Sequence, residues 1–98
     1  MAITSILDLQ LKPDSLDTAH QVLRETLVAT RAFPGCLDVT VLVDNDDPAH
    51  VVLLEKWESV DHDLAYRAWR TTPDGASDLG KILAAAPKLT HLTTAEGN

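Results

Sequence analysis

Three segments of this chain alternate apolar and polar residues with a period of two, and this pattern limits the folds that the chain can adopt. In residues 3–11, Leu7, Leu9 and Leu11 fall on one face and polar residues fall on the other. Successive side chains of a β-strand point to opposite faces, so this alternation predicts strands with one buried face. The other two segments are residues 36–44 and residues 50–58.

The second of these segments carries apolar residues on both faces. One face is aliphatic throughout and is formed by Leu37, Val39, Val41 and Val43. The opposite face is mixed and is formed by Cys36, Thr40 and Leu42. A strand that is apolar on both faces belongs in a sheet that is covered on both sides. We therefore expect helices on one face and, on the mixed face, a second copy of this chain, which would help a domain of 98 residues to bury enough surface.

Helical periodicity separates the first two predicted strands. Asp14 or Ser15 can cap a helix that runs to about Ala32. Its apolar residues recur at steps of three and four, which places them on one face of the helix. They are Leu16, Ala19, Leu23 and Leu27. Pro34 and Gly35 close this helix before the second strand begins.

The third strand leads into a second helix, which we predict from Val60 to about Arg70. Ser59 is a favourable N-cap, because its hydroxyl can accept a hydrogen bond from a free backbone N–H of the first turn. Asp61 and Asp63 lie in that turn, where the helix dipole favours negative charge. These signals set the start of the helix more firmly than its end.

Two further segments complete the pattern. In residues 44–49, DNDDPA, turn-forming side chains join the second and third strands into a hairpin, and Pro48 bars continuation of the strand ladder. A further helix is predicted from about Ala76 to Ala86, followed by a short final strand in residues 89–94. The inward residues of this helix would be Leu79, Ile82 and Leu83.

The order of these elements is strand, helix, strand, strand, broken helix, strand. This order predicts the α+β, ferredoxin-like split βαβ arrangement, in which helices cover one face of a four-stranded antiparallel sheet. The length of the chain suits one such domain over residues 1–98. The other face of the sheet would then be free for a second copy.

Charge and cysteine content narrow the classes of partner and compartment. The net charge is −7, and the eight Lys and Arg residues are scattered, which disfavours nucleic acids and anionic membrane surfaces as partners. Cys36 is the single cysteine and cannot form an internal disulfide, so a reduced, cytoplasmic setting fits best. The first residues carry no signal-peptide pattern, and no apolar run approaches the roughly 20 residues of a membrane-spanning helix.

Large side chains concentrate in residues 57–69, which hold both tryptophans and the single tyrosine. On the second predicted helix, His62, Tyr66 and Trp69 follow one another at steps of four and three and therefore share one face. They could supply a proton acceptor, a hydrogen-bond donor and a stacking wall for an aromatic ligand. The alternative is that Tyr66 and Trp69 cap the core with their polar ends in water while His62 is exposed.

Further candidate residues lie on the third and fourth strands. Glu55 and Trp57 share one face of the third strand. Glu55 is a general base if burial raises its pKa, and otherwise an exposed or ion-paired carboxylate, while Trp57 is an anchor for a helix or a wall for a ligand. His91, in the final strand, could accept a substrate proton near neutral pH or lie exposed. Neither His20 nor His50 has a partner at metal-ligand spacing.

The segment FPGCLDVTVLVDNDDPAHVVLLEKWES, residues 33–59, resembles the antibiotic biosynthesis monooxygenase family. The likeness lies in the Pro-Gly-Cys-Leu entry to the second strand, the Asp-Pro hairpin and the Glu-x-Trp that ends the third strand. It implies a homodimer that forms a dimeric α/β barrel and oxidises phenolic, anthrone-like or quinol substrates with molecular oxygen, without flavin, haem or metal. Many members have a histidine nine residues after this Trp, where this chain has Tyr66.

These observations lead to one expected function and one alternative. The expected function is a cofactor-independent monooxygenase that uses molecular oxygen as co-substrate on an aromatic hydroxylated molecule. His62 or His91 would be the base, with Tyr66 or Arg67 holding the resulting oxyanion. The remaining substrate-binding candidates are Glu55, Trp57 and Trp69. The alternative is a dimer on the same scaffold that binds a small molecule, or acts in stress, without catalysis.

Overall fold

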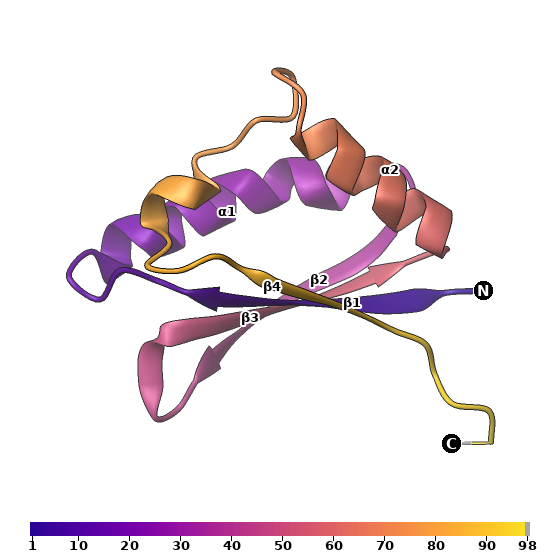
Figure 1. Cartoon of the computed structure of the whole chain (residues 1–98), viewed down its shortest axis with the longest axis horizontal. Coiled ribbons are helices and arrows are strands. Elements are labelled where there is room, and N and C mark those ends of the chain that lie inside the picture. Colours follow the sequence, from indigo (N-terminus) through magenta and orange to yellow (C-terminus); the bar gives the residue numbers. More distant parts are fainter. Residues whose placement is uncertain (98) are drawn as a thin grey trace.

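The computed structural model of the chain describes residues 1–97 and confirms the ferredoxin-like α+β fold (Figure 1). Its strands are β1 (Ile3–Gln10), β2 (Cys36–Asp44), β3 (Asp47–Trp57) and β4 (Lys88–Leu92). Its helices are α1 (Leu16–Ala32), α2 (Val60–Arg70) and the short 3₁₀ helix η1 (Leu79–Ile82). The sheet order is β2-β3-β1-β4, and all neighbouring strands are antiparallel.

Both long helices lie on the same side of the sheet, which we call the inner face (Figure 1). The main core forms where the buried stripe of α1 packs on the inner residues of β1 and β3. Helix α1 contributes Ala19, Leu23 and Leu27, at the spacing of one helical face. The strands contribute Leu9, Val51 and Leu53, which alternate with partly or fully exposed residues. Each fully buried aliphatic side chain stabilises the fold by about 1.5–3 kcal/mol.

The turn after α1 depends on a glycine. Gly35 has a positive φ of 90°, which favours glycine, and a Cβ at this position would lie 2.3 Å from the ring of His62. The backbone N–H of Cys36 donates to the carbonyl of Phe33 (3.0 Å) and closes the turn. Gly35 therefore lets the chain reverse against the first turn of α2.

A β-bulge corrects the predicted faces of β2. Cys36 pairs with Trp57 and Asp38 pairs with Lys56, so Leu37 is an extra residue in this strand. Cys36 consequently packs against the inner core, whereas Leu37 is 54% exposed. The predictions that Cys36 shares a face with Thr40 and Leu42, and Leu37 with Val39, are therefore wrong.

The hairpin between β2 and β3 is tighter than the sequence indicated. Asp44 pairs with Asp47, and β3 begins at Asp47, three residues earlier than predicted. Pro48 therefore lies inside the strand rather than stopping the ladder. It occupies the second position of β3, beside a register irregularity at Val43 and Asp44, where a missing N–H is tolerated.

The helix predicted from Ala76 to Ala86 is wrong, because only η1 is helical in this segment. After η1 the backbone is extended and bonds to the end of β1: Ala84 N donates to Gln10 O (2.7 Å), and Lys12 N donates to Ile82 O (3.0 Å). These long-range bonds replace the i→i−4 bonds that a helix would need. The three residues expected to point inward still pack on the main core, namely Leu79, Ile82 and Leu83.

No labelled helix lies over the outer face of the sheet (Figure 1). The strand pairing gives this face a band of apolar residues. Leu54 pairs with Ile6 on one side and with Thr40 on the other, and Val52 pairs with Leu42. Ile6, Thr40, Val52 and Leu54 are partly buried, while Leu42 is 47% exposed. None of the helices within residues 1–97 is long and apolar enough to cross a membrane.

Candidate functional site

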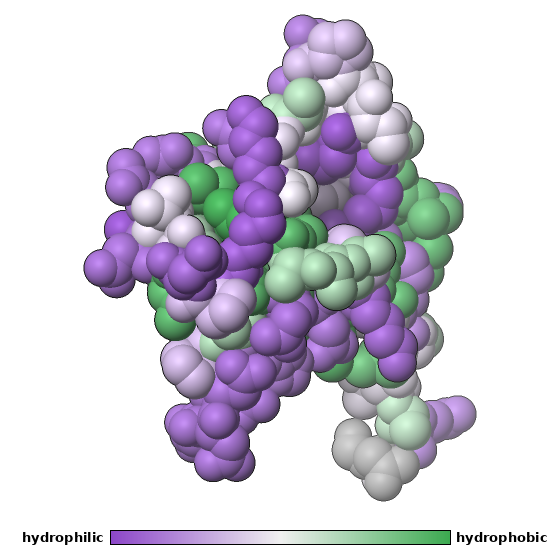
Figure 2. Space-filling model, turned by 60° about the vertical axis from the view of Figure 1, so that its left-hand side comes forward, coloured by the Kyte–Doolittle hydropathy of each residue, from purple (hydrophilic) through white to green (hydrophobic). Residues whose placement is uncertain are grey.

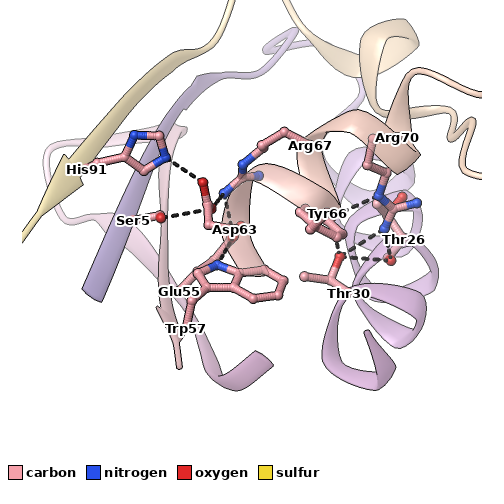
Figure 3. Close-up of polar contacts among 10 residues, drawn as sticks. All are labelled: Ser5, Thr26, Thr30, Glu55, Trp57, Asp63, Tyr66, Arg67, Arg70 and His91. Atoms are coloured by element: carbon pink, nitrogen blue, oxygen red, sulfur yellow. Dashed lines mark hydrogen bonds and ion pairs between the residues drawn. The ribbon is translucent and has the colours of Figure 1, made fainter. Parts of the chain in front are cut away.

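Helix α2 presents two polar pairs at helical spacing toward the interior. Its start is fixed by Ser59, whose hydroxyl accepts from His62 N (3.2 Å), as the sequence predicted. Asp63 and Arg67 form one i, i+4 pair, and Tyr66 and Arg70 form another. Figure 3 shows the first pair reaching toward β1, β3 and β4, and the second reaching toward α1.

The first pair forms a buried ionic cluster with β3. Arg67 Nη2 donates to Glu55 Oε1 (2.7 Å) and to Asp63 Oδ1 (2.9 Å), and Trp57 Nε1 donates to the same Glu55 oxygen (3.2 Å). Glu55 is 1% exposed and Asp63 is 0% exposed. Buried carboxylates need such partners, because an unpaired buried charge is very costly. Glu55 is therefore both buried and ion-paired.

Asp63 also links this cluster to β1 and β4. Its Oδ1 accepts from Ser5 Oγ (3.0 Å), and its Oδ2 lies 2.5 Å from His91 Nε2. An ionised carboxylate can only accept, so with Asp63 ionised His91 donates this hydrogen bond through Nε2. Among residues 1–97 the other ring nitrogen, Nδ1, has no hydrogen-bond partner. The side chain of His91 is 37% exposed.

In the second pair, the guanidinium of Arg70 donates hydrogen bonds to neutral oxygen atoms only. Arg70 Nε donates to Tyr66 Oη (2.8 Å), and Arg70 Nη2 donates to Thr30 Oγ1 (2.9 Å) and Thr26 O (2.9 Å). The hydroxyls of Thr30 and Tyr66 share a further hydrogen bond of 2.6 Å. Arg70 also donates through Nη1 to Gly75 O (3.3 Å), which ties the following loop to α1. Sequence reasoning missed this role of Arg70 and Thr30.

The aromatic side chains form one cluster beside these networks. The ring centroids of Trp57 and Tyr66 are 5.0 Å apart, and Phe33 lies 5.3 Å from Tyr66 and 5.4 Å from Trp69. Trp57 is fully buried and Tyr66 almost so. Packing at these distances stabilises the fold. Trp57 is thus an anchor between β3 and α2.

A pocket of about 320 Å³ opens between α1, α2 and the inner face of the sheet, and we call it the main pocket. One wall is aliphatic and contains Leu7, Leu23, Leu27, Leu53 and Leu79. The polar lining contains Thr26, Glu55, Tyr66, Arg67, Arg70 and Ser77. Figure 2 shows a recess beneath the projecting loop of residues 71–78, bordered by hydrophilic side chains. An apolar cavity with a few convergent polar groups is typical of a small-molecule site.

A second pocket of about 250 Å³ adjoins the main pocket and shares Arg70 and Thr26 with it. Trp69 lines this second pocket rather than the main one. The guanidinium of Arg70 stacks 4.9 Å from the Trp69 ring and 5.1 Å from the Tyr66 ring. The side chain of Arg70 therefore borders both pockets.

The two candidate bases lie outside the lining of the main pocket. His62 packs on Gly35, with Nδ1 2.7 Å from Ser59 Oγ and Nε2 3.6 Å from Glu58 Oε2. His62 packs against Gly35, and Tyr66 and Trp69 pack against Phe33, so the three share one face of α2, as their spacing predicted. Only Tyr66 of the three lines the main pocket. His91 lies with Asp63 on the β4 side of α2 (Figure 3).

The remaining titratable candidates show no metal-binding geometry. Within residues 1–97, no three His, Cys, Asp or Glu side chains form a cluster that could hold a metal ion. Burial raises the pKa of Cys36, and the nearby carboxylate of Glu55 adds to this shift, so this cysteine remains a thiol. Cys36 therefore serves the core, where it packs against both hydrophobic clusters.

The comparisons with solved structures support the fold. A variant of SnoaB from Streptomyces nogalater, described as a cofactor-independent oxygenase, superposes with a TM-score of 0.81 at 16% identity, covering 97% of this chain and 94% of that one. A conserved protein from Methanosarcina mazei gives a TM-score of 0.81 at 18% identity, with the same coverage. Rv0793 from Mycobacterium tuberculosis gives 0.75 at 21% identity, covering 98% and 97%.

The sequence itself identifies the family. No curated protein matches the chain at a significant level of similarity. The sequence profile described as antibiotic biosynthesis monooxygenase, in contrast, matches residues 2–76, which include β1 through α2 and most of the loop of residues 71–78. The chain therefore belongs to the antibiotic biosynthesis monooxygenase family, as the resemblance in residues 33–59 indicated.

Proposed function

We propose that this protein is a cofactor-independent monooxygenase that oxidises an aromatic hydroxylated molecule, such as a quinol, phenol or anthrone, with molecular oxygen. The observation that carries the proposal is the main pocket, in which an aliphatic wall faces Glu55, Tyr66 and Arg67. The wall suits an aromatic ring, and the polar groups suit its hydroxyl substituents. Family membership supports the same reaction class.

The chemistry requires the protein to bind the substrate, remove a proton and hold the anion in a site with little water. The electron-rich anion of the substrate itself reduces oxygen, so the protein has to supply no electron. Glu55 is the nearest proton acceptor to such a ligand, because it lines the main pocket and its Oε2 has no partner among the described residues. Tyr66 and Arg67 would position the ring and its hydroxyl, and Trp57 and Trp69 would support this wall from behind.

His91 and His62 are the alternative bases. The geometry favours His91, because its hydrogen bond to Asp63 orients the ring and leaves Nδ1 free to accept a proton. His62 already uses Nδ1 in a contact with Ser59. Either histidine would act on a substrate that extends beyond the main pocket, or on a proton delivered through water.

Oxygen uptake with a panel of quinols, phenols and anthrones tests the function. With a substrate that turns over, replacing the true base should lower turnover by about 10²- to 10⁴-fold without unfolding the protein. The variants are Glu55→Gln, His91→Ala, His62→Ala and the double histidine variant, and the control is Asp61→Asn, an exposed carboxylate in the first turn of α2. Because Glu55 is buried and ion-paired, each variant is compared with the wild type by circular dichroism.

The outcomes separate the base candidates and the two functions. Loss of turnover in Glu55→Gln alone assigns the base to the pocket carboxylate, whereas loss in His91→Ala alone assigns it to the histidine. Tight binding of phenols with no oxygen uptake for any of them contradicts the monooxygenase proposal and favours a small-molecule-binding protein.

We also propose that the protein is a homodimer that buries the outer face of its sheet. The support is the apolar band of Ile6, Leu42, Val52 and Leu54, over which no other element of residues 1–97 packs. A second copy would cover this band and bring the sheets face to face as a dimeric barrel. Sedimentation equilibrium at micromolar concentration tests this, and a monomer at that concentration contradicts it.

A further inference from the structure

The two arginines that line the main pocket differ in the charge of their partners. Arg67 lies against two carboxylates, Glu55 at 2.7 Å and Asp63 at 2.9 Å, so its charge is balanced within the protein. Every hydrogen bond of Arg70 goes to a neutral oxygen of Tyr66, Thr26, Thr30 or Gly75. Among residues 1–97, no carboxylate forms an ion pair with Arg70.

The donor count of Arg70 leaves room for one more acceptor. A guanidinium has five N–H groups. Those of Arg70 that are already used are the Nε donor, both Nη2 donors and one Nη1 donor. The second Nη1 donor remains available, and the bonds to α1 and to the loop hold the guanidinium in place. The group is thus a positioned cation with one unused donor, and its side chain lines both the main pocket and the second pocket.

We propose that Arg70 binds an ionised phenolic oxygen of the ligand, so that the main pocket selects the phenolate form of an aromatic hydroxylated molecule. This inference rests on the proposed function, because it assumes that the main pocket takes such a ligand. Arg70, rather than Arg67, would bind the oxyanion, because carboxylates of the protein already balance the charge of Arg67. An opposite charge within about 4–6 Å typically favours the ionised form of an acid by one to three pKa units.

The charges around Arg70 direct an anion into the main pocket. On that side the other charged groups in the lining are Glu55 and Arg67, which pair with each other, while Asp63, the second carboxylate bound to Arg67, is buried outside the lining. The second pocket, on the other side of Arg70, is lined by three carboxylates, Glu25, Asp74 and Asp78. These carboxylates repel an anion, so the contact with Arg70 is open to it only from the aliphatic side. Tyr66 is the remaining titratable group in contact with Arg70.

Binding of 4-nitrophenol tests the inference without turnover. This phenol ionises near neutral pH, and its phenolate absorbs at a wavelength distinct from that of the phenol. We expect a spectral titration of the bound ligand to show its pKa lowered by about one unit or more relative to free ligand, which corresponds to at least about tenfold tighter binding of the phenolate. The control ligand is 4-nitroanisole, which cannot ionise. Any pH dependence of its binding therefore comes from titration of the protein's own groups, such as its histidines.

Variants then assign the effect to Arg70. Arg70→Gln should bring the pKa of bound 4-nitrophenol back to that of the free ligand, whereas Arg70→Lys should keep most of the lowering because it keeps the charge. Arg24→Gln removes the same charge from the exposed side of α1 and should change nothing. Far-UV circular dichroism checks the fold. If Arg70→Gln does not fold, the titration of the wild type and of Arg70→Lys decides.

Each outcome bears on the inference. A lowered ligand pKa that Arg70→Gln abolishes supports it. A ligand pKa that is unchanged on binding, or lowered equally in wild type and Arg70→Gln, overturns it while leaving the proposed function intact if both ligands bind. If neither 4-nitrophenol nor 4-nitroanisole binds, the proposed function fails and the inference falls with it.

Discussion

The two faces of the sheet use the same strands for different purposes. On the inner face, β3 places Leu53 in the core and Glu55 in the ionic cluster, and both are almost completely buried. On the outer face, the same strand places Val52 and Leu54 in a band that is only partly buried, with His50 at its rim. One strand therefore serves the fold and the pocket on one side and a free surface on the other.

The two faces differ in their surroundings, and therefore in whether a charged side chain needs a partner within the chain. Inner residues are enclosed by helices, so every charge there needs a partner, and Glu55, Asp63 and Arg67 supply each other. Outer residues meet solvent, so apolar side chains are tolerated there and charges need no partner within the chain. Changes on the inner face should consequently alter folding, while changes on the outer face should alter assembly.

The largest effect should come from Asp63→Ala, which removes the acceptor shared by Ser5, Arg67 and His91. Breaking a buried ion pair by removing one partner typically costs about 3–5 kcal/mol. The free energy of unfolding, measured by urea titration, should therefore fall by this amount. The control is Asp61→Ala, an exposed residue in the same helical turn. If the two variants unfold at the same urea concentration, the ionic cluster does not stabilise the inner face.

Adjacent residues of β3 provide the sharpest contrast between the faces. Leu53→Ala should lower the free energy of unfolding by about 2–5 kcal/mol, because it leaves a cavity in the main core. Leu54→Ala, one residue further on and facing outward, should cost clearly less under conditions in which the chain is monomeric. Urea titrations at low protein concentration measure both, and equal losses would contradict the assignment of the faces.

A charge on the outer face should affect assembly more than folding. We expect Leu54→Asp to weaken the proposed dimer at least about tenfold, because burying an unpaired charge costs more than about 1.4 kcal/mol. Val28→Asp is the control, since Val28 is an exposed aliphatic residue on α1, away from the sheet. Sedimentation equilibrium compares the two variants, and equal dissociation constants would remove this face as the interface.

The smallest effect on stability should come from His50, at the edge of the outer face. His50 Nδ1 lies 2.9 Å from Asp44, and Nε2 lies 3.2 Å from Asp8. The hydrogen bonds to Asp44 and then Asp8 raise the pKa of His50 above its ordinary 6.5, and the bond to His50 lowers the pKa of Asp44 below 3.8. The histidine contribution is complete below pH 6.5 and is lost as the pH rises through the raised value.

The aspartate contribution has the opposite sign. It is complete above pH 3.8 and is lost as the pH falls through the lowered pKa of Asp44. The stability difference between wild type and His50→Gln should therefore be greatest between these limits and should disappear in alkaline solution. Thermal melts across this range measure it. A difference that grows with rising pH would show that the His50 contacts do not stabilise the hairpin through charge.

Sequence periodicity predicted the elements whose stability is local. The bounds of α2 and β2 agree with the prediction, because Ser59 supplies a cap and the alternation in residues 36–44 is continuous. The alternation of β1 and the apolar stripe of α1 likewise identified most of the buried face. Patterns of this kind depend on neighbours three or four residues away, or two in a strand, so they can be read along the chain.

The predictions that proved wrong depend on contacts across the fold. The segment after Ala76 has helical spacing, but hydrogen bonds between Ala84 and Gln10, and between Lys12 and Ile82, draw it into the end of β1. The bulge at Leu37 turns Cys36 inward because of its register with β3. No pattern within either segment indicates these partners.

The pocket residues show the same division. Glu55, Tyr66 and Arg67 were candidates from the sequence and line the main pocket. Asp63 and Arg70 were missed as site residues, although each lies four residues from a residue already chosen, Arg67 and Tyr66 respectively. That i, i+4 spacing was the available signal.

The sequence by itself determined the family, through its match to the family profile. It also determined the order of strands and helices and which residues alternate between the faces, because periodicity and capping act over a few residues. The tertiary structure decided which charges are balanced. Arg67 and Arg70 lie three residues apart on one helix, yet Arg67 reaches the carboxylate of β3 and Arg70 reaches only neutral oxygens, those of Tyr66, α1 and the loop. The physical reason is that electrostatic partners depend on which strand or helix packs opposite each face of α2, and distance in space sets that energy while distance along the chain does not.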